Sequence, residues 1–226
     1  MVTEIVPGTG GESGAGIAPG ARGEGAAPVA VERGAVRGPD GRLRCPWGLA
    51  PAEYLSYHDE EWGRPVTGDQ PMFERLCLEG FQSGLSWLTI LRKRANFRAA
   101  FRDFDIETVA GFGPADVTRL LADAGIVRNR AKIEAAITNA RAALELPGGL
   151  AAAVWRYADP GAPAPRTVAD IPATTPGSMA LARELRRHGF RFVGPTTVYA
   201  TLQACGLVDD HLEACFRRGA YRAGPP

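Results

Sequence analysis

Two histidines and two cysteines carry side chains that bind metal ions, and their spacing suggests which of them act together. His211 and Cys215 are four residues apart, so on a helix both side chains would point from one face toward a single ion. Cys45 and His58 would supply a second pair. Two thiolates and two imidazoles fill a tetrahedral zinc shell and exclude water, which predicts one structural zinc ion. By spacing alone, His211 and Cys215 could equally cap a helix and fill a core.

A second group of residues combines aromatic rings with a single carboxylate, a combination that suits a flat ligand with positive charge or amine groups. An aromatic ring stacks on a nucleobase, while a carboxylate accepts hydrogen bonds from its N–H groups and opposes positive charge. The alternative is that the tryptophans belong to a core and that Glu79 caps or solvates the end of a helix. The group consists of Trp47, Tyr54, Tyr57, Trp62, Glu79 and Trp87.

Residues 120–133 have the pattern of a helix, a tight turn with glycine, and a second helix, as in a helix-hairpin-helix motif. Such a turn presents backbone N–H groups at the start of the second helix to phosphates, and nearby basic side chains add positive charge. The alternative is an ordinary helical hairpin with a solvated basic face. The expected DNA contacts come from Gly125, Arg128, Arg130 and Lys132.

The elements that position these residues are expected to be helices. Apolar residues recur with helical spacing, and no sustained two-residue alternation occurs, so the fold is predicted to be all-α. Asp69 and Ser86 are expected to cap two helices, and Leu85 is either a wedge on the turn between them or a buried residue. The expected apolar faces are Met72, Leu76 and Cys77, then Leu88, Leu91 and Ala95, then Ile133, Ala136, Ile137 and Ala140. Further helices are expected from Pro114 through Leu121, from Ser178 to His188 and from Thr196 to Cys205.

Composition bounds the organisation of the chain and its partners. With 26 lysines and arginines against 25 acidic residues, the chain has no global field that attracts polyanions, so any nucleic-acid contact must be local. Residues 1–43 are rich in glycine, alanine and proline and contain no aromatic residue, which predicts a disordered tail before a helical domain at 44–220 and a flexible end at 221–226. No export signal or membrane-spanning run is evident, so we expect a cytoplasmic protein with no membrane partner.

Taken together, these patterns resemble the bacterial 3-methyladenine DNA glycosylase I family, within the helix-hairpin-helix DNA glycosylases. The resemblance runs from Cys45 to about Cys215 and includes no part of the tail. The matching motifs are Tyr-His-Asp-Glu-Glu-Trp-Gly at 57–63, Cys-Leu-Glu-Gly at 77–80, Gly-Leu-Ser-Trp at 84–87, Asp-Ala-Gly-Ile at 123–126 followed by Arg130, Gly-Phe-Arg-Phe-Val-Gly at 189–194 and Gln-Ala-Cys-Gly-Leu-Val-Asp-Asp-His at 203–211.

The resemblance implies a helical bundle in which one structural zinc ion joins the N- and C-terminal segments, and it implies roles for the residues above. Cys45, His58, His211 and Cys215 match the zinc ligands. Glu79 matches the carboxylate that recognises the base, and Gly84 and Leu85 match the turn that enters the gap left by the flipped nucleotide. Tyr54, Tyr57 and Trp87 fall where the family lines its pocket, with Trp87 expected to stack on the alkylated adenine and Trp47 expected beside them. A departure is Phe81, where relatives often have glutamine, and it is expected to alter the pocket rim and the base selectivity.

The resemblance implies a DNA repair enzyme that excises 3-methyladenine from double-stranded DNA without an organic cofactor. A monomer is expected by default. Alkylation makes the base positively charged, so it leaves as a neutral molecule, and the enzyme mainly needs to flip the nucleotide, hold it and stabilise the oxocarbenium-like sugar. No aspartate that could activate water is evident in a matching place. Lys132 is a conceivable Schiff-base nucleophile, but a phosphate or solvent contact is expected instead, which predicts a monofunctional glycosylase.

Two other functions are compatible with parts of the sequence. A zinc-stapled DNA-binding module without catalysis would keep the hairpin and the zinc ligands but would tolerate changes around Glu79. The complete set of aromatic residues and carboxylate favours an enzyme. A zinc hydrolase is disfavoured because four protein ligands leave no open position on the ion.

Overall fold

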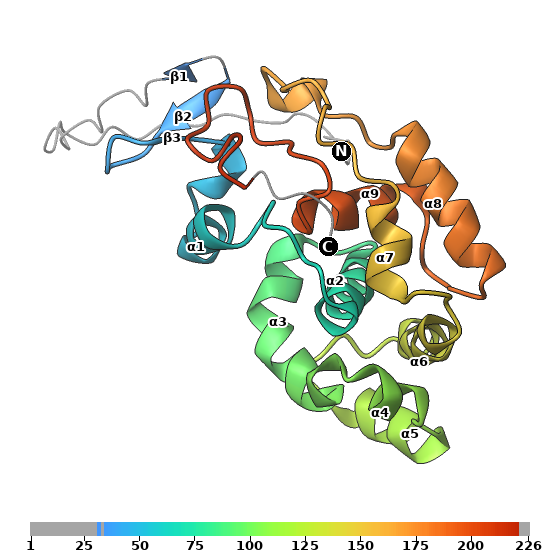
Figure 1. Cartoon of the computed structure of the whole chain (residues 1–226). Coiled ribbons are helices and arrows are strands. Elements are labelled where there is room, and N and C mark those ends of the chain that lie inside the picture. The colour runs from blue at the N-terminus through green and yellow to red at the C-terminus, as the bar shows by residue number, and fades with distance from the viewer. Residues whose placement is uncertain (1–30, 33, 222–226) are drawn as a thin grey trace, which may run out of the picture.

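The computed structural model describes residues 31–32 and 34–221, and within them the chain is mostly helical (Figure 1). The prediction of a helical fold is therefore confirmed. No helix in this part of the chain is long and apolar enough to cross a membrane. The α-helices are α1 Ala52–Glu60, α2 Asp69–Gln82, α3 Trp87–Ala100, α4 Ile106–Ala110, α5 Pro114–Ala122, α6 Arg130–Leu144, α7 Leu150–Trp155, α8 Pro176–Arg187 and α9 Pro195–Ala204, and the three-residue helical turns are η1 Pro46–Gly48, η2 Arg102–Phe104 and η3 Val168–Asp170.

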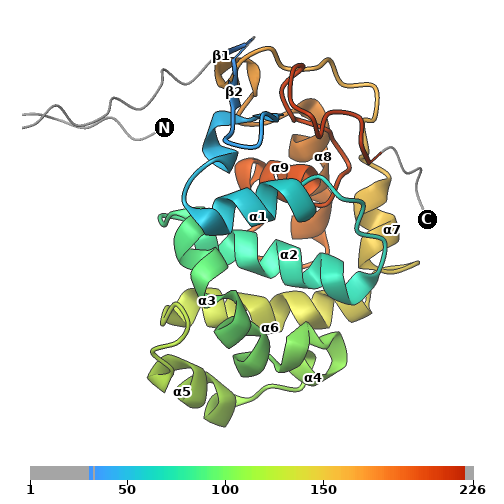
Figure 2. The ribbon, with the colours of Figure 1, turned by 90° about the vertical axis from the view of Figure 1, so that its left-hand side faces the viewer.

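The helix α2 lies at the centre of the molecule, in contact with α3, α6, α7 and α9. Figure 2 shows α1, α2 and α6 one above another, with α4 and α5 at one end and the small sheet at the other. Because other helices surround α2, its buried positions run almost without a break from Met72 to Phe81. Phe81 of α2 packs its ring against the rings of Phe97 and Phe101, and these three rings fill part of the core.

Local signals set several helix ends where the sequence predicts them. The Ser86 hydroxyl accepts a hydrogen bond from the Thr89 N–H and caps α3. Pro114 occupies the first turn of α5. Just beyond α8 and α9, Gly189 and Gly206 have φ angles of +89° and +73°, a conformation that glycine adopts readily and that ends a helix.

A three-stranded antiparallel sheet precedes the helices and corrects the predicted start of the folded region at Arg44. Its strands are β1 Val31–Glu32, β2 Ala35–Arg37 and β3 Leu43–Arg44. The segment has no aromatic residue of its own, but Ala35 is buried against Leu212 and Cys215 of the C-terminal segment. Packing against a distant part of the chain therefore orders it. Residues 1–30 and 222–226 lie outside the described residues, and for them the predicted tail and flexible end stay predictions.

Two helix assignments need correction in detail. Asp69 begins α2 but does not cap it; its carboxylate accepts a hydrogen bond of 2.7 Å from the Ala151 N–H and so caps α7. In α3 the fully buried residues are Ile90, Phe97 and Ala100, whereas the predicted face of Leu88, Leu91 and Ala95 is partly buried or exposed. The reason is that α3 contacts both α1 and α2, so its most buried side faces α2 while Leu91 packs toward α1.

Candidate active site and metal centre

An open cavity of about 280 Å³ lies where α1, α2, α3 and α9 meet, a size at the small end of ligand sites. All five side chains that were predicted to bind a base line it, namely Trp47, Tyr54, Tyr57, Glu79 and Trp87. The remaining lining residues are Trp62, Gln82, Ile171, Ala200 and Gln203. Of these, Trp62 belonged to the aromatic group identified in the sequence. Gln203 begins one of the matching motifs but was given no role, and Gln82, Ile171 and Ala200 were not predicted because they line the cavity only through the packing of their helices and loops.

Glu79 lies in the C-terminal half of α2, and its side chain is only 6% exposed. Burial raises the pKa of its carboxyl group to about 8, while the positive charge of Arg75 acts in the opposite direction. None of the residues that the structure describes donates a hydrogen bond to this carboxyl group. Burying a carboxylate without hydrogen-bond partners costs free energy. A buried, unsatisfied acid at the wall of an open cavity is suited to bind a ligand that brings its own N–H donors or positive charge.

Aromatic rings form the rest of the cavity wall. Tyr57 and Trp87 lie with ring centroids 5.4 Å apart and planes tilted by 46°. The Tyr54 hydroxyl accepts a hydrogen bond of 3.0 Å from the Leu88 N–H, which ties α1 to the first turn of α3. Trp87 and Trp47 are half-buried, since they line the cavity and also pack against buried residues of the core, and the indole N–H of Trp87 has no partner among the described residues. The rings thus leave flat faces open to a planar ligand.

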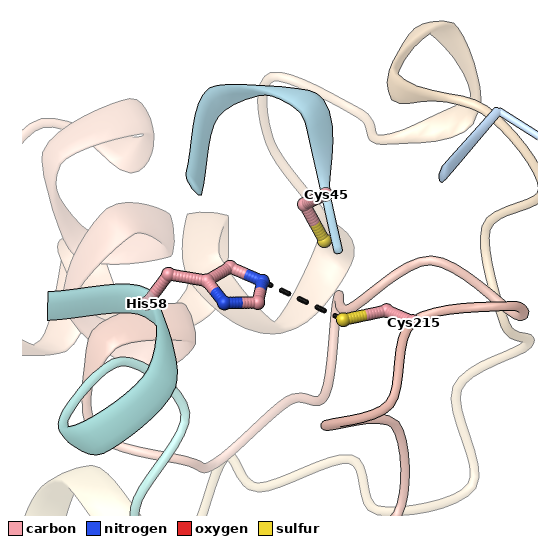
Figure 3. Close-up of side chains that lie close together, drawn as sticks. All are labelled: Cys45, His58 and Cys215. Carbon is pink, nitrogen blue, oxygen red and sulfur yellow. Dashed lines mark hydrogen bonds between the residues drawn. The ribbon is translucent and has the colours of Figure 1, made fainter. Parts of the chain in front are cut away.

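Cys45, His58 and Cys215 form a buried group that can hold a metal ion, with their ligand atoms all within 4.8 Å of one another. Figure 3 shows the three side chains converging from the end of β3, from α1 and from the C-terminal segment. The Nε2 atom of His58 lies 3.5 Å from the Cys215 sulfur. A hydrogen bond from Cys45 lowers the pKa of the Cys215 thiol, which favours the thiolate form that binds cations.

His211 stands next to this group, with its ring centroid 5.2 Å from that of His58. Its Nδ1 atom lies 2.9 Å from an oxygen of Asp209, and its buried Nε2 atom has no partner among the described residues. In the same way, His58 Nδ1 lies 2.8 Å from Asp59. A carboxylate on Nδ1 is the usual support for an imidazole that binds metal through Nε2. The buried, unpaired Nε2 of His211 and the two nearby cysteine sulfurs therefore fit a metal ion.

The segment that carries His211 and Cys215 is not a helix, so the helical spacing argument for this pair is wrong. The chain from Cys205 onward forms turns after α9. The Asp209 carboxylate accepts the His211 N–H, and the Cys215 N–H donates to the Leu212 carbonyl, which folds the segment back on itself. The two side chains approach one region because of these turns rather than because of a shared helix face.

The metal group and the cavity share a wall of aromatic rings. Trp47 lies 5.1 Å from the His58 ring, and Trp62 lies 4.5 Å from the His211 ring, both edge to face. The His58 ring packs against the backbone of Gly48, so this position requires a residue without a side chain. A Cβ atom on Gly48 would lie 2.5 Å from the His58 ring and overlap it. Any loss of order at the metal group would therefore reach two tryptophans of the cavity wall.

Opposite the sheet, α5 and α6 are two helices joined by the turn at 123–129, as the pattern of residues 120–133 predicts, while a DNA-binding role of this pair stays a prediction. The Asp123 carboxylate accepts the Gly125 N–H at 2.7 Å and shapes the turn, and the Asn129 side chain caps α6. Arg128 and Arg130 are exposed at the start of α6, where backbone N–H groups and the helix dipole favour anions. These features place a basic helix start at the surface.

Between α2 and α3, the turn presents Leu85 to solvent. Leu85 is 42% exposed, so the alternative of a buried leucine is wrong. Gly84 before it has a φ of +80°, and a Cβ atom added there would meet nothing within 4 Å beyond its own turn. The turn therefore carries an apolar side chain outward on a backbone conformation that favours glycine.

Lys132 does not face solvent or the cavity, contrary to the prediction of a phosphate or solvent contact. The side chain is 8% exposed, and its ammonium donates hydrogen bonds of 2.9 and 2.5 Å to the carbonyls of Phe81 and Ser83. Burial lowers the pKa of Lys132. The start of α6 packs against the end of α2, where carbonyls that lack helical partners need donors. Lys132 therefore supports the base of the turn that carries Gly84 and Leu85.

Phe81 also differs from its prediction. Its side chain is 1% exposed and packs on Phe97 and Phe101 at centroid distances of 4.7 and 5.7 Å. It lies on the side of α2 that faces the core and does not line the cavity. The expectation that Phe81 alters the pocket rim is therefore wrong, since neighbouring residues on a helix point in different directions.

Comparison with known proteins gives consistent matches over the same region. A model of the family described as methyladenine glycosylase matches residues 47–218. The chain is 46% identical over 177 residues to DNA-3-methyladenine glycosylase 1 of Escherichia coli (strain K12), covering 76% of this chain and 95% of that protein. A crystal structure of 3-methyladenine DNA glycosylase I superimposes with a TM-score of 0.74 at 46% identity, covering 76% of this chain and 98% of the other. A variant of 3-methyladenine DNA glycosylase I in complex with 3-methyladenine gives a TM-score of 0.73 at 35% identity, covering 76% and 96%.

Proposed function

This chain belongs to the methyladenine glycosylase family, and we propose on that basis that the cavity around Glu79 binds 3-methyladenine flipped out of alkylated DNA. The enzyme is a DNA-3-methyladenine glycosylase that excises this base in DNA repair. The observation that carries the assignment of the site is the buried Glu79 carboxyl, which faces an aromatic cavity with no hydrogen-bond donor from the described residues.

The charge of the substrate explains why this site needs few catalytic groups. A methyl group on N3 makes the adenine base cationic, so the N-glycosidic bond breaks with both electrons passing to the base, which leaves as neutral 3-methyladenine. Water then adds to the sugar carbon and loses a proton, which produces an abasic site. The main contributions of the protein are to hold the flipped nucleotide and to favour the geometry in which the bond lengthens.

Glu79 and the rings around it have separate roles in this proposal. The faces of Tyr57 and Trp87 take up the flat base, and Tyr54 and Trp47 enclose it. The Glu79 carboxylate accepts a hydrogen bond from the base and opposes its positive charge, so base binding favours the ionised form of Glu79. The cationic base thereby supplies the donor and the charge that the protein does not provide.

We also propose that the enzyme is monofunctional. A lyase reaction needs an amine that can attack the sugar carbon. Lys132, which is the basic side chain of the hairpin considered for this role, is occupied by two carbonyl acceptors and lies outside the cavity wall. Release of the base should therefore leave the DNA strand intact.

For the metal group, we propose one structural Zn²⁺ bound by Cys45, His58, Cys215 and His211. The unpaired Nε2 of His211 supports its role as the fourth ligand. Thiolate and imidazole are ligands that zinc prefers, and four of them leave no position for a catalytic water. The ion would join the segments before α1 and after α9 and keep Trp47 and Trp62 in place.

For DNA binding, we propose that Gly84 and Leu85 enter the gap left by the flipped nucleotide. Gly125, Arg128 and Arg130 contact the phosphate backbone at the start of α6, while Lys132 acts only by supporting the turn. We further propose that the protein works as a monomer in the cytoplasm, as the sequence predicts.

The activity is tested by incubating the purified protein with duplex DNA that has been methylated, and by separating the released bases by chromatography. We expect free 3-methyladenine and an intact strand until the abasic sites are cleaved by heat or alkali. A heat-inactivated sample gives the rate of spontaneous loss. Release of 3-methyladenine at only the spontaneous rate would refute the proposed function, and strand breaks without alkali would refute the monofunctional reaction.

A further inference from the structure

The guanidinium of Arg44, the last residue of β3, is buried between two carboxylates. The side chain is 3% exposed. On one side, Nε and Nη2 donate hydrogen bonds of 2.9 and 2.8 Å to the two carboxylate oxygens of Asp59, the bidentate arrangement that a planar guanidinium favours. On the other side, Nη1 and Nη2 each donate a hydrogen bond of 2.7 Å to the Asp40 carboxylate. All three nitrogens of the guanidinium therefore have carboxylate partners, and its orientation is fixed.

Asp59 connects Arg44 to His58, one of the residues that can hold the metal ion. The Asp59 oxygen that accepts a hydrogen bond from Nε of Arg44 also lies 2.8 Å from Nδ1 of His58. With its Nδ1 proton toward Asp59, the imidazole presents the lone pair of Nε2, which lies 3.5 Å from the Cys215 sulfur (Figure 3). A carboxylate in this position fixes both the tautomer and the direction of a ligating imidazole. Arg44 in turn keeps this carboxylate from rotating away.

The β2–β3 turn and the C-terminal segment hold Arg44 in place. Asp40 lies in this turn, and a Cβ atom on Gly38 would lie 2.7 Å from Nη1 of Arg44, so the backbone of the turn passes close to the guanidinium. The Phe216 N–H donates to the Leu43 carbonyl at 2.9 Å, and the Phe216 ring centroid lies 5.0 Å from the guanidinium carbon. The network therefore joins the sheet, α1 and the C-terminal segment.

The support of the second imidazole, His211, is built differently. Its partner Asp209 is 35% exposed, against 15% for Asp59. The Nε atom of Arg218 lies 3.7 Å from an Asp209 oxygen, beyond hydrogen-bond distance, and the Arg218 guanidinium donates to backbone carbonyls instead. Water and salt screen a buried ion pair less than an exposed one, so the arginine on Asp59 should have the larger effect.

We propose that Arg44 is a positioning residue of the metal centre, which holds Asp59 so that Nε2 of His58 points at the ion. Asp40 completes the support from the β2–β3 turn. The inference rests on the proposed zinc site and adds two residues that the ligand spacing does not predict, both before the stretch matched by the family model, residues 47–218. Zinc leaves a closed shell only after a ligand turns away, so loss of Arg44 should free His58 and speed the release of the ion.

The test follows zinc as it leaves the folded protein, at neutral pH, into an excess of the chromogenic chelator pyridylazoresorcinol. Arg44→Met keeps the length of the side chain without its N–H donors. It should release zinc about 10- to 100-fold faster, the scale on which loss of an orienting partner weakens metal binding. Arg44→Lys should also release zinc faster than the wild type, because an ammonium cannot pair with both carboxylates in the bidentate geometry. Asp40→Ala should have a smaller effect in the same direction.

A second measurement separates positioning of the ligand from general stability. In the Co²⁺-substituted protein, Arg44→Met should change the visible absorption of the ion, which reports the geometry of its ligands. Arg98→Met is the matched control, because Arg98 pairs with Glu74 between α3 and α2, outside the metal group. It should keep the wild-type rate of zinc release and the wild-type Co²⁺ spectrum, even where it lowers the melting temperature.

A wild-type rate of zinc release in Arg44→Met would overturn the proposal, as would equal acceleration in Arg98→Met. If Arg44→Met does not fold, a wild-type rate in Asp40→Ala overturns it. Zinc release is measured without base release, so a wild type that binds zinc but releases no 3-methyladenine would refute the function and leave this inference standing. A wild type that binds no zinc would overturn the inference together with the metal site.

Discussion

The cavity region and the hairpin region treat buried polar groups in opposite ways. Around the cavity and the metal group, the Glu79 carboxyl, the Trp87 indole N–H and the His211 Nε2 atom have no hydrogen-bond partner among the described residues. Beneath the Leu85 turn and the loop between α8 and α9 that carries Phe192, Lys132 and Asn139 are just as buried, but each makes two hydrogen bonds to the backbone.

This difference indicates which region receives ligands and which region supports them. A buried polar group without a partner costs free energy unless a ligand, ion or water satisfies it. A buried group with two backbone partners instead fixes the shape of the chain. We therefore expect substitutions around the cavity to change binding and catalysis, and substitutions beneath the two loops to change stability first.

The largest effect should come from removing the metal ion. This experiment tests whether the Nε2 atom of His211 lacks a protein partner because it binds the ion. Cys215→Ser should lower the zinc content, measured by elemental analysis, and should destabilise the fold by on the order of 5 kcal/mol, because ion binding is coupled to folding. A change of this size lowers the melting temperature by roughly 10–20 °C.

Cys205→Ala provides the control for this experiment, since Cys205 is a fully buried cysteine outside the metal group. It should keep one zinc ion per chain. A Cys215→Ser protein with full zinc content and an unchanged melting temperature would remove Cys215 from the site and would leave the orphaned His211 without an explanation.

The second largest effect should be on catalysis at Glu79. Glu79→Gln keeps the size of the side chain but cannot oppose the charge of the base, so the rate of 3-methyladenine release should fall at least about a hundredfold, the scale of losing one preorganised electrostatic contact. The melting temperature at pH 7 should not fall, because the buried acid has no protein partner to lose.

Single-turnover release from methylated DNA measures this rate, and Glu145→Gln is the control because Glu145 is exposed at the end of α6. Unfolding of Glu79→Gln would show that Glu79 belongs with the supporting residues rather than with the ligand site. Wild-type base release by a folded Glu79→Gln protein would show that another group recognises the base.

The sequence predicts the helices and the members of the cavity well, because these depend on local signals and on motifs that resemble a family. Periodicity and capping residues identify α3, α5, α6, α8 and α9, and the cavity residues Tyr57, Glu79 and Trp87 lie in the matching motifs. The sheet at 31–44 was missed because its order depends on Leu212 and Cys215, more than 150 residues away. Short-range patterns do not contain such a contact.

Side-chain direction is the part that the sequence predicts least well. Lys132 falls in the basic hairpin stretch, but whether it faces DNA or the end of α2 depends on how α6 packs. Phe81 follows a motif residue of the cavity by two positions and points into the core instead. The left-handed conformation of Phe192, with a φ of +55°, has no signal in the sequence, because it results from the contacts of Asn139 with the Arg191 backbone rather than from a local preference for glycine.

A smaller effect is expected at Lys132, in the supporting region. Lys132→Met should destabilise the fold by about 2 kcal/mol, because it leaves two carbonyls without their donor. The melting temperature should fall by roughly 4–8 °C.

Arg130→Met is the matched comparison, two positions earlier on the same helix but exposed. It should leave the melting temperature unchanged, weaken DNA binding, and reduce the salt dependence of that binding by about one phosphate contact. The reverse pattern would make Lys132 the DNA contact.

The finest distinction between the regions is the pH dependence of stability. Because burial raises the pKa of Glu79 to about 8, the folded protein holds a proton on this group that the unfolded chain releases at the lower, ordinary pKa. The bound proton stabilises the folded protein fully when the pH is below the pKa of Glu79 in the unfolded chain. This contribution is lost as the pH rises through about 8. Between pH 6 and 8 the free energy of unfolding of the wild type should therefore fall relative to that of Glu79→Gln, by about 1 kcal/mol per pH unit. Denaturant titrations at several pH values measure this difference, and the contributions of groups common to both proteins cancel.

At Lys132 burial lowers the pKa, so its contribution to the pH dependence of stability has the opposite sign and appears at higher pH. Parallel pH profiles for the wild type and Glu79→Gln would mean that the Glu79 carboxyl is satisfied within the protein, and the contrast between the two regions would fail.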